Sequence, residues 1–385
     1  MDLELTDEQA YLRSVADDLL DVRAPLSLAR TFLDGDGDPS ALWKALAEVG
    51  WYALGIDDED DGSIGLPGLC LLAASIGGHA APSLVVDTVI TSRIAAAAAG
   101  GAARARWADS FADGSVTVAL AHLESSGSWN LDCIKTRALD ADRYVVDGTK
   151  LDVHHAQRAG AFAVTVLTDD GPALLLIPSD TTGVKVEPES PLDPSGGACT
   201  VRFSGVAVGS ENVLAGAESV ETLLAALEVG AVVSAAEGLG AASKCLDMAV
   251  AYARERKQYG KVIGSFQALQ HLLAERHVLR ETAWSTILYA AAAIDDGLED
   301  ASEASSVAKA HAARVVRQIT EGAMQVFGGI AYTWEHDVHL LARRALAAER
   351  RFGDAIYHER VLGARIAARV PGIAAIDGRV GSSIG

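Results

Sequence analysis

The chain has 385 residues, of which 50% are hydrophobic and 22% are charged, a balance typical of a folded globular protein and not of a disordered one. It carries 52 acidic and 32 basic residues, a formal net charge of -20, and this excess of carboxylates argues against a protein that binds nucleic acid phosphates. At roughly 100–200 residues per domain, the length predicts two or three domains.

The chain shows no sign of a secretory signal or of a membrane span. Its first residues are acidic and polar, with no basic start and no apolar stretch behind them. No uninterrupted apolar run is long enough to cross a bilayer. Four scattered cysteines without CxxC spacing are typical of reduced thiols: Cys70, Cys133, Cys199 and Cys245. We therefore expect a cytoplasmic protein.

Three regions of different character follow one another along the chain. Residues 1–113 have helical periodicity and predict an N-terminal helical domain. Residues 114–216 contain short β-branched segments at regular spacing, with turn residues between them, and predict a β-barrel domain. Residues 217–385 return to long apolar helical repeats broken by glycine and predict a four-helix bundle. The expected fold class is α+β, in the order helices, barrel, bundle.

The individual elements follow from the same periodicities. Strands are expected at 116–120, 144–146, 162–166, 173–177, 184–186 and 199–203. Bundle helices are expected at 220–256, 266–294, 303–327 and 338–350, with a last one after Asp354.

Common catalytic and metal-binding signatures do not occur in the sequence. There is no GxSxG, HExxH or GxxxxGK[ST] motif, and Gly238-Leu239-Gly240 lies within a helical run, where it favours helix packing. His336 and His339 have helical i, i+3 spacing beside acidic residues. Polar residues of this kind suit an exposed helix start, so we predict no metal site there.

Two helix ends followed by glycine stand out. The first reads Arg-Lys-Gln-Tyr-Gly at 256–260 and continues with Gly-Ser-Phe-Gln at 264–267; the second reads Gln-Val-Phe-Gly-Gly at 325–329. Arg and Gln side chains can donate hydrogen bonds to a phosphate, and a Gly-Gly turn lets the backbone approach a ligand closely. A helix cap with a tight turn explains the same residues, so from these residues alone both interpretations stay open.

The two segments together resemble the signature of the acyl-CoA dehydrogenase family. Leu-Thr-Asp-Glu-Gln at 5–9 and the segment 203–214 extend this resemblance over nearly the full length. It implies FAD-dependent α,β-dehydrogenation of an acyl-CoA thioester, with an electron-transfer flavoprotein as electron acceptor. It also implies that FAD lies across a dimer interface, with the bundle of one subunit contacting the cofactor of its neighbour. The residues assigned to the neighbour's FAD are Arg256, Gln258, Phe266, Gln267, Gln325, Gly328 and Gly329.

The sequence departs from the family at the catalytic base. The family uses a glutamate in a Tyr-Glu-Gly-Thr segment or on the first bundle helix, and the matching residues here are Phe352 and Gly230. Neither can accept a proton. Glu237 lies two helical turns beyond Gly230, about 10 Å along the axis. It is either a relocated base or a buried acid paired with a neighbouring helix.

The β domain departs from the family as well. In the family, one loop of this domain donates hydrogen bonds to the flavin ring, and a tryptophan covers the ring. Here the loop is replaced around 123–129, and the tryptophan is replaced by Asp152. The part of the FAD site within one subunit therefore looks degraded, while the part offered to a neighbour looks intact. We hypothesise a subunit of a heteromeric acyl-CoA dehydrogenase that acts in fatty acid or steroid degradation. The alternatives are a homotetrameric enzyme that uses Glu237 and a non-catalytic CoA-thioester-binding or scaffold protein.

Overall fold

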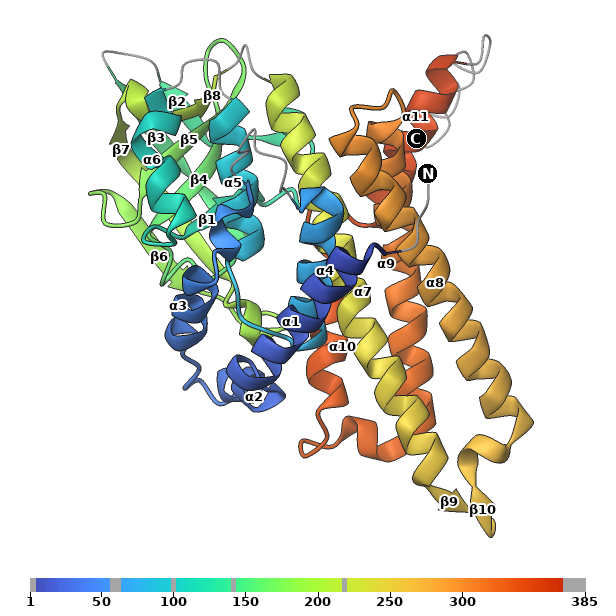
Figure 1. Ribbon diagram of the computed structural model, residues 1–385. Helices are drawn as coiled ribbons and strands as arrows, with labels where there is room; N and C mark the ends of the chain where they lie inside the picture. The colour runs from blue at the N-terminus through green and yellow to red at the C-terminus, as the bar shows by residue number, and fades with distance from the viewer. Residues whose placement is uncertain (1–4, 56–63, 98–101, 140–142, 217–219, 370–385) are drawn as a thin grey trace, which may run out of the picture.

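A computed structural model describes residues 5–55, 64–97, 102–139, 143–216 and 220–369 (Figure 1). Helices form the first part of the chain, an eight-stranded sheet the second, and long helices the third. The structure therefore confirms the expected order of helices, sheet and bundle.

Six helices form the N-terminal part: α1 (Asp7–Arg23), α2 (Leu26–Leu33), α3 (Ser40–Glu48), α4 (Gly65–Gly78), α5 (Val85–Ala97) and α6 (Ala102–Ala112). The hydroxyl of Thr6 and the side chain of Gln9 cap α1 reciprocally, as the sequence at this helix start favours. Helix α4 packs backbone to backbone against the first bundle helix, because a Cβ at Gly77 would stand 1.9 Å from the carbonyl oxygen of Glu237. Only glycine permits this approach, which fixes the N-terminal helices to the bundle.

The sheet consists of β1 (Val118–Ala121), β2 (Arg137–Leu139), β3 (Tyr144–Val153), β4 (Ala161–Leu167), β5 (Pro172–Pro178), β6 (Val184–Pro188), β7 (Cys199–Val208) and β8 (Val213–Ala215). The strand order is β6-β7-β3-β2-β4-β5-β8, and β1 pairs with β4 in parallel. The region expected to form a barrel is this sheet. Its hydrogen-bonded path runs from β6 at one end to β8 at the other. The strands β2 and β8 were not expected from the sequence, since three residues give too short a pattern.

Five helices form the C-terminal bundle: α7 (Val220–Glu255), α8 (Gln267–Asp295), α9 (Ala301–Phe327), α10 (Val338–Arg350) and α11 (Ala355–Arg369). A short hairpin of β9 (Lys257–Gln258) and β10 (Lys261–Val262) joins α7 to α8 at the lower end of the bundle in Figure 1. Helix α7 is the one described helix long and apolar enough to cross a membrane, but 72% of its most apolar window is buried. It packs against α4, α8, α9 and α10, as a core helix of the bundle does.

Candidate functional site

The seven residues that the resemblance assigns to a neighbour's cofactor lie at one end of the bundle. The hairpin β9–β10 and the start of α8 carry four of them, and the end of α9 with the turn behind it carries the other three. Tyr252 of α7 and Phe327 of α9 bring these two groups together, with ring centroids 5.0 Å apart. The structure thus brings together two segments that are some sixty residues apart in sequence; we call this surface the bundle tip.

The bundle tip has free hydrogen-bond donors and open space. Within the described residues, the guanidinium of Arg256 forms no ion pair, and the side chains of Gln258 and Gln325 are exposed. Gly328 has a φ of 67°, and a Cβ at Gly328 or Gly329 would meet no atom within 4 Å. An anionic group can therefore approach this backbone and meet unpaired donors.

The charge of the bundle tip is opposite to that of the whole chain. Residues 254–261 hold four cations and one acidic residue, whereas the whole chain has a net charge of -20. The ring of Phe266 lies beneath the ammonium of Lys261, 4.4 Å from the ring centroid, and edge-on to Tyr259. A diphosphate with an attached flat base fits this combination of cations, amides and aromatic rings.

The two positions that the sequence resemblance matches to the catalytic base meet in the interior. Phe352 follows α10, and its ring lies directly against Gly230 of α7, where a Cβ would stand 2.3 Å from the ring. Phe352 has a φ of 57° and is 3% exposed. The side chain of His358 forms a hydrogen bond with the backbone oxygen of Phe352 at 2.8 Å and holds this turn. A buried phenyl ring thus fills the space that a carboxylate would need.

Aromatic side chains continue from Phe352 into the β domain. Trp129 stacks on Phe352 with a centroid distance of 4.8 Å, and His122 stacks on the other side of Trp129, also at 4.8 Å. Burial lowers the pKa of His122 to about 3, so its imidazole is a neutral flat ring at physiological pH. Among these residues, Leu151 and Asp152 there remains a cavity of about 10 Å³, enough for one water molecule at most.

A buried ion pair fixes the loop that carries Trp129. Glu124 accepts hydrogen bonds from the backbone of Lys135 and Thr136, from the hydroxyl of Thr136, and from the ammonium of Lys150 at 2.8 Å. Lys150 itself is fully buried, and its two other contacts are His122 O and Thr165 Oγ1. Every charge in this pair has partners, so the loop is held firmly.

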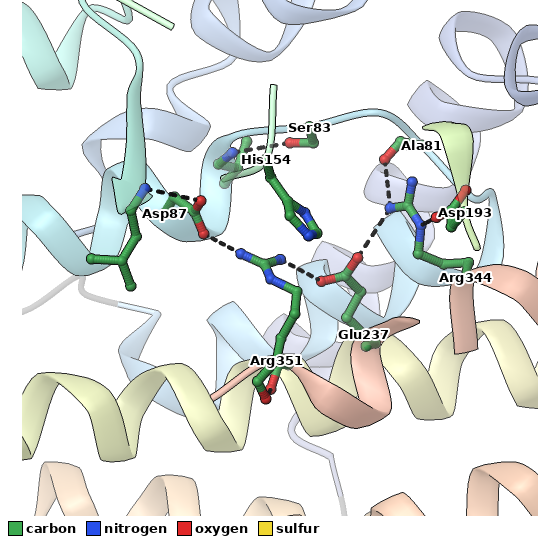
Figure 2. Close-up of polar contacts among 12 residues, drawn as sticks. Ala81, Ser83, Asp87, His154, Asp193, Glu237, Arg344 and Arg351 are labelled. Atoms are coloured by element: carbon green, nitrogen blue, oxygen red, sulfur yellow. Dashed lines mark hydrogen bonds and ion pairs between the residues drawn. The ribbon is translucent and has the colours of Figure 1, made fainter. Parts of the chain in front are cut away.

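Glu237 lies in a buried network of ion pairs (Figure 2). Its Oε1 accepts a hydrogen bond from Arg344 at 3.0 Å, and its Oε2 lies 3.6 Å from Arg351. Arg344 reaches on to Asp193 of the β domain, and Arg351 reaches on to Asp87 of α5. Both oxygens of Glu237 are therefore engaged, which is the arrangement of the paired buried acid that the sequence offered as an alternative to a base.

This network connects all three parts of the chain. Asp87 belongs to the N-terminal helices, Asp193 to the β domain, and both arginines to the bundle. Arg344 also donates to the carbonyl oxygen of Ala81 at 3.0 Å. Burial raises the pKa of Asp87, and Arg351 partly offsets this effect. Such buried charges are costly unless they are paired, so the network fixes how the three parts meet.

A groove of about 750 Å³ opens outside the aromatic stack, between the β domain and the segment that joins α10 to α11. Two of its three arginines are paired: Arg314 binds Glu359 in a bidentate ion pair, and Arg317 binds Glu349 at 3.0 Å. The third, Arg350, forms no ion pair within the described residues, and the carboxylates of Asp152 and Asp354 line the same groove. The groove therefore offers an anionic group one unpaired arginine beside two carboxylates.

The two halves of the expected FAD site therefore differ. The bundle tip offers unpaired donors, cations and open glycines, which fit the phosphate end of the cofactor. The interior positions matched to the flavin ring hold a stack of side chains around a cavity of about 10 Å³, which does not fit a three-ring system.

The remaining histidine pair does not form a metal site in the described part of the chain. No group of three or more His, Cys, Asp or Glu residues there is arranged to hold a metal ion. His336 accepts a hydrogen bond from the backbone of Val338 and so caps α10, while His339 stacks on Trp334.

The sequence did not point to Trp129, His122, Arg344 or Arg351 as members of one centre. His122 and Trp129 follow β1 in the β domain. Arg344 lies in α10, and Arg351 comes directly after it. Arg351 did not stand out in the sequence, because Glu349, Arg350 and Asp354 lie beside it, and a single arginine does not identify its buried partners.

Comparison with known proteins finds sequence similarity to acyl-CoA dehydrogenases. Residues 220–367 match the family model described as acyl-CoA dehydrogenase, C-terminal domain. The acyl-CoA dehydrogenase IpdE2 of Mycolicibacterium smegmatis is 39% identical over 127 residues, which is 33% of this chain and 39% of that protein. The protein IpdE2 of Mycobacterium tuberculosis is 28% identical over 344 residues, 88% of this chain and 91% of that protein.

Solved structures of this family share the fold over almost the whole chain. The ChsE4-ChsE5 complex from Mycobacterium tuberculosis superposes with a TM-score of 0.82 at 23% identity, covering 97% of this chain and 100% of the matched chain. Butyryl-CoA dehydrogenase from Megasphaera elsdenii gives 0.87 at 22% identity, covering 95% and 100%. A steroid acyl-CoA dehydrogenase described as Tcur3481-Tcur3483 gives 0.82 at 25% identity, covering 94% and 98%.

Proposed function

We propose that the chain is a member of the acyl-CoA dehydrogenase family, which the match of residues 220–367 to a family model supports, and that it is one subunit of a heteromeric acyl-CoA dehydrogenase. In this role its bundle tip completes the FAD site of a second, catalytically complete subunit. The partner supplies the flavin-ring contacts and the base. The reaction is the FAD-dependent α,β-dehydrogenation of an acyl-CoA thioester, with an electron-transfer flavoprotein as acceptor.

The observation that carries this proposal is the difference between the two halves of the cofactor site. The donors of the bundle tip are unpaired and accessible, as a surface that serves another chain requires. The interior holds Phe352 against Gly230 at the two base positions. A chain that retains only the outward-facing half can contribute to catalysis only through a neighbour.

The residues of the bundle tip have distinct roles in this proposal. Arg256 and Gln258 donate hydrogen bonds to the partner's cofactor phosphates, and Gln325 adds an amide from α9. Gly328 and Gly329 leave the backbone open to close approach. The bound flavin supplies a hydride acceptor. This chain's residues hold the cofactor's phosphate end and so orient it for the partner.

Two structural relatives support the proposed assembly and substrate class. One is a complex of two different chains, ChsE4 and ChsE5, and the other is described as a steroid acyl-CoA dehydrogenase with two components. We therefore propose a second family member as the partner and a bulky CoA thioester, such as a steroid side chain, as the substrate class.

The proposal is tested by purifying the chain alone and together with candidate partner subunits, beginning with the product of the neighbouring gene. We expect the isolated chain to lack the flavin absorbance band, and the co-purified pair to show the band and to dehydrogenate acyl-CoA. Full flavin content and turnover in the isolated chain would favour the homotetrameric alternative. A preparation that stays colourless with every candidate partner would favour the CoA-thioester-binding or scaffold alternative.

A further inference from the structure

We propose that the indole of Trp129 plugs an interior slot beside Phe352 and His122, and that removing the indole opens a binding site for a flat, uncharged heteroaromatic ring. This inference goes beyond the proposed function. It assigns a plug residue and a ligand class to the interior of this chain, whether or not a partner is bound.

The first support is the place of the indole among flat groups. It lies between the ring of Phe352, at an interplanar angle of 29°, and the ring of His122, at 6°. The imidazole is neutral because burial lowers the pKa of His122 to about 3. The rings of Phe352 and His122, which carry no net charge, form the walls of a slot that the indole fills. A flat ring that replaces the indole finds an aromatic face at each wall.

The second support is that Trp129 separates two cavities. The small cavity of about 10 Å³ and the groove of about 750 Å³ are both lined by Leu123, Trp129 and Asp152. Truncating the indole joins them, so the interior slot becomes reachable from solvent. The combined space falls within the range of ordinary ligand pockets, about 300–1,000 Å³.

The third support concerns the loop, which stays in place without the indole. Glu124 holds it through the backbone of residues 135 and 136 and through the buried Lys150. None of these contacts involves the side chain of Trp129. The vacated slot is therefore expected to stay open, as cavities with rigid walls do.

The charges of the groove select the ligand class. Three arginines line the groove. Arg314 and Arg317 are paired with Glu359 and Glu349, and the third, Arg350, is balanced by the carboxylates of Asp152 and Asp354. A ring system without phosphates is therefore expected to enter, and a dinucleotide is not. Riboflavin, which carries a flat ring system without phosphate, is the probe. FAD carries the same ring with a diphosphate and tests whether the groove excludes phosphate.

The experiment compares the full chain as wild type, W129A and W334A in a titration of riboflavin followed by quenching of its fluorescence. Trp334 lies in the segment before α10, stacks on His339 and is 52% exposed, so W334A controls for the loss of an indole outside the slot. We expect W129A to bind riboflavin at least tenfold more tightly than the other two proteins, and to bind FAD more weakly than riboflavin.

Thermal melts establish that each variant is folded, and W129L provides a second, less disruptive truncation that is expected to give the same result. Wild-type protein that binds riboflavin as tightly as W129A would overturn the proposal, as would folded W129A and W129L proteins without binding. Either result leaves co-purification with a flavin-bearing partner untouched, so the two proposals fail separately.

Discussion

The ring of Phe352 fills the space above Gly230, so that the two positions matched to the expected catalytic base from the sequence form one packed contact. Phe352 adopts a left-handed backbone conformation with a φ of 57°, which is unfavourable for a bulky residue. Such a conformation persists only where the surroundings hold it. Here the bond from His358 to the backbone of Phe352 and the stacked Trp129 do so.

Substitution of Gly230 tests this contact. In G230A, the new Cβ would stand 2.3 Å from the ring of Phe352. We expect a loss of about 1–3 kcal/mol in the free energy of unfolding, as for other overpacked cores. The control G363A adds a Cβ to α11 where no atom lies within 4 Å, and helix propensity predicts a gain of up to about 1 kcal/mol. Denaturant unfolding of both variants measures the difference; equal stabilities would contradict the packing described here.

Removal of Arg351 tests the network that joins the three parts of the chain. R351M leaves Asp87 and Glu237 buried without this cation, so we expect the free energy of unfolding to fall by about 3–5 kcal/mol. R317M is the matched control, since the half-exposed Arg317 forms a surface ion pair with Glu349 worth at most about 1 kcal/mol. If thermal unfolding shows similar losses for the two variants, Arg351 does not hold the domains together.

Substitution of Glu237 distinguishes a structural role of this residue from a catalytic one. E237Q keeps the shape of the side chain but removes its charge from between Arg344 and Arg351. We expect a lower melting temperature for the assembled enzyme with less than a tenfold change in kcat at a temperature where it stays folded. A base would show the opposite pattern, a loss of about 10²–10⁴ in kcat with little change in stability.

The burial of His122 predicts a loss of stability in acid. Its pKa is about 3 in the folded chain, below the ordinary value of 6.5, so the unfolded chain binds a proton first as the pH falls. Stability is therefore lost between pH 6.5 and pH 3, by about 2 kcal/mol at pH 5 from this residue. H122F keeps a flat ring in the stack and should reduce this loss in unfolding experiments at pH 7 and pH 5. An unchanged pH dependence in H122F would assign the acid sensitivity to other groups.

Arg256 tests the role of the bundle tip in the assembled enzyme. R256M removes a cation that forms no ion pair in the described residues, so the isolated chain should keep its melting temperature. The co-purified pair should lose a large part of its flavin on gel filtration, because a charge-assisted hydrogen bond to phosphate is lost. K244M, on the outer side of α7, is the control and should retain flavin. Full flavin retention by R256M would remove Arg256 from the cofactor site.

The sequence by itself determined the order of the three regions and the bounds of the long helices. The expected helix at 338–350 is α10, and the expected helix at 220–256 is α7 to within one residue. These elements have long, strongly periodic patterns, which carry local information about the backbone. The short strands β2 and β8 have no such pattern, and the sequence missed them. The resemblance to the acyl-CoA dehydrogenase family followed from two motifs at the bundle tip, each of which is a short continuous stretch of sequence.

Only the tertiary structure decided what fills the centre of the molecule. The sequence left Glu237 as either a base or a paired acid, and its pairing with Arg344 and Arg351 depends on where α10 crosses α7. The stack of His122, Trp129 and Phe352 likewise depends on how the β domain meets the bundle. Contacts between segments more than 100 residues apart leave no local periodicity in the sequence. Their energies come from burial and charge pairing that exist only once the chain has folded.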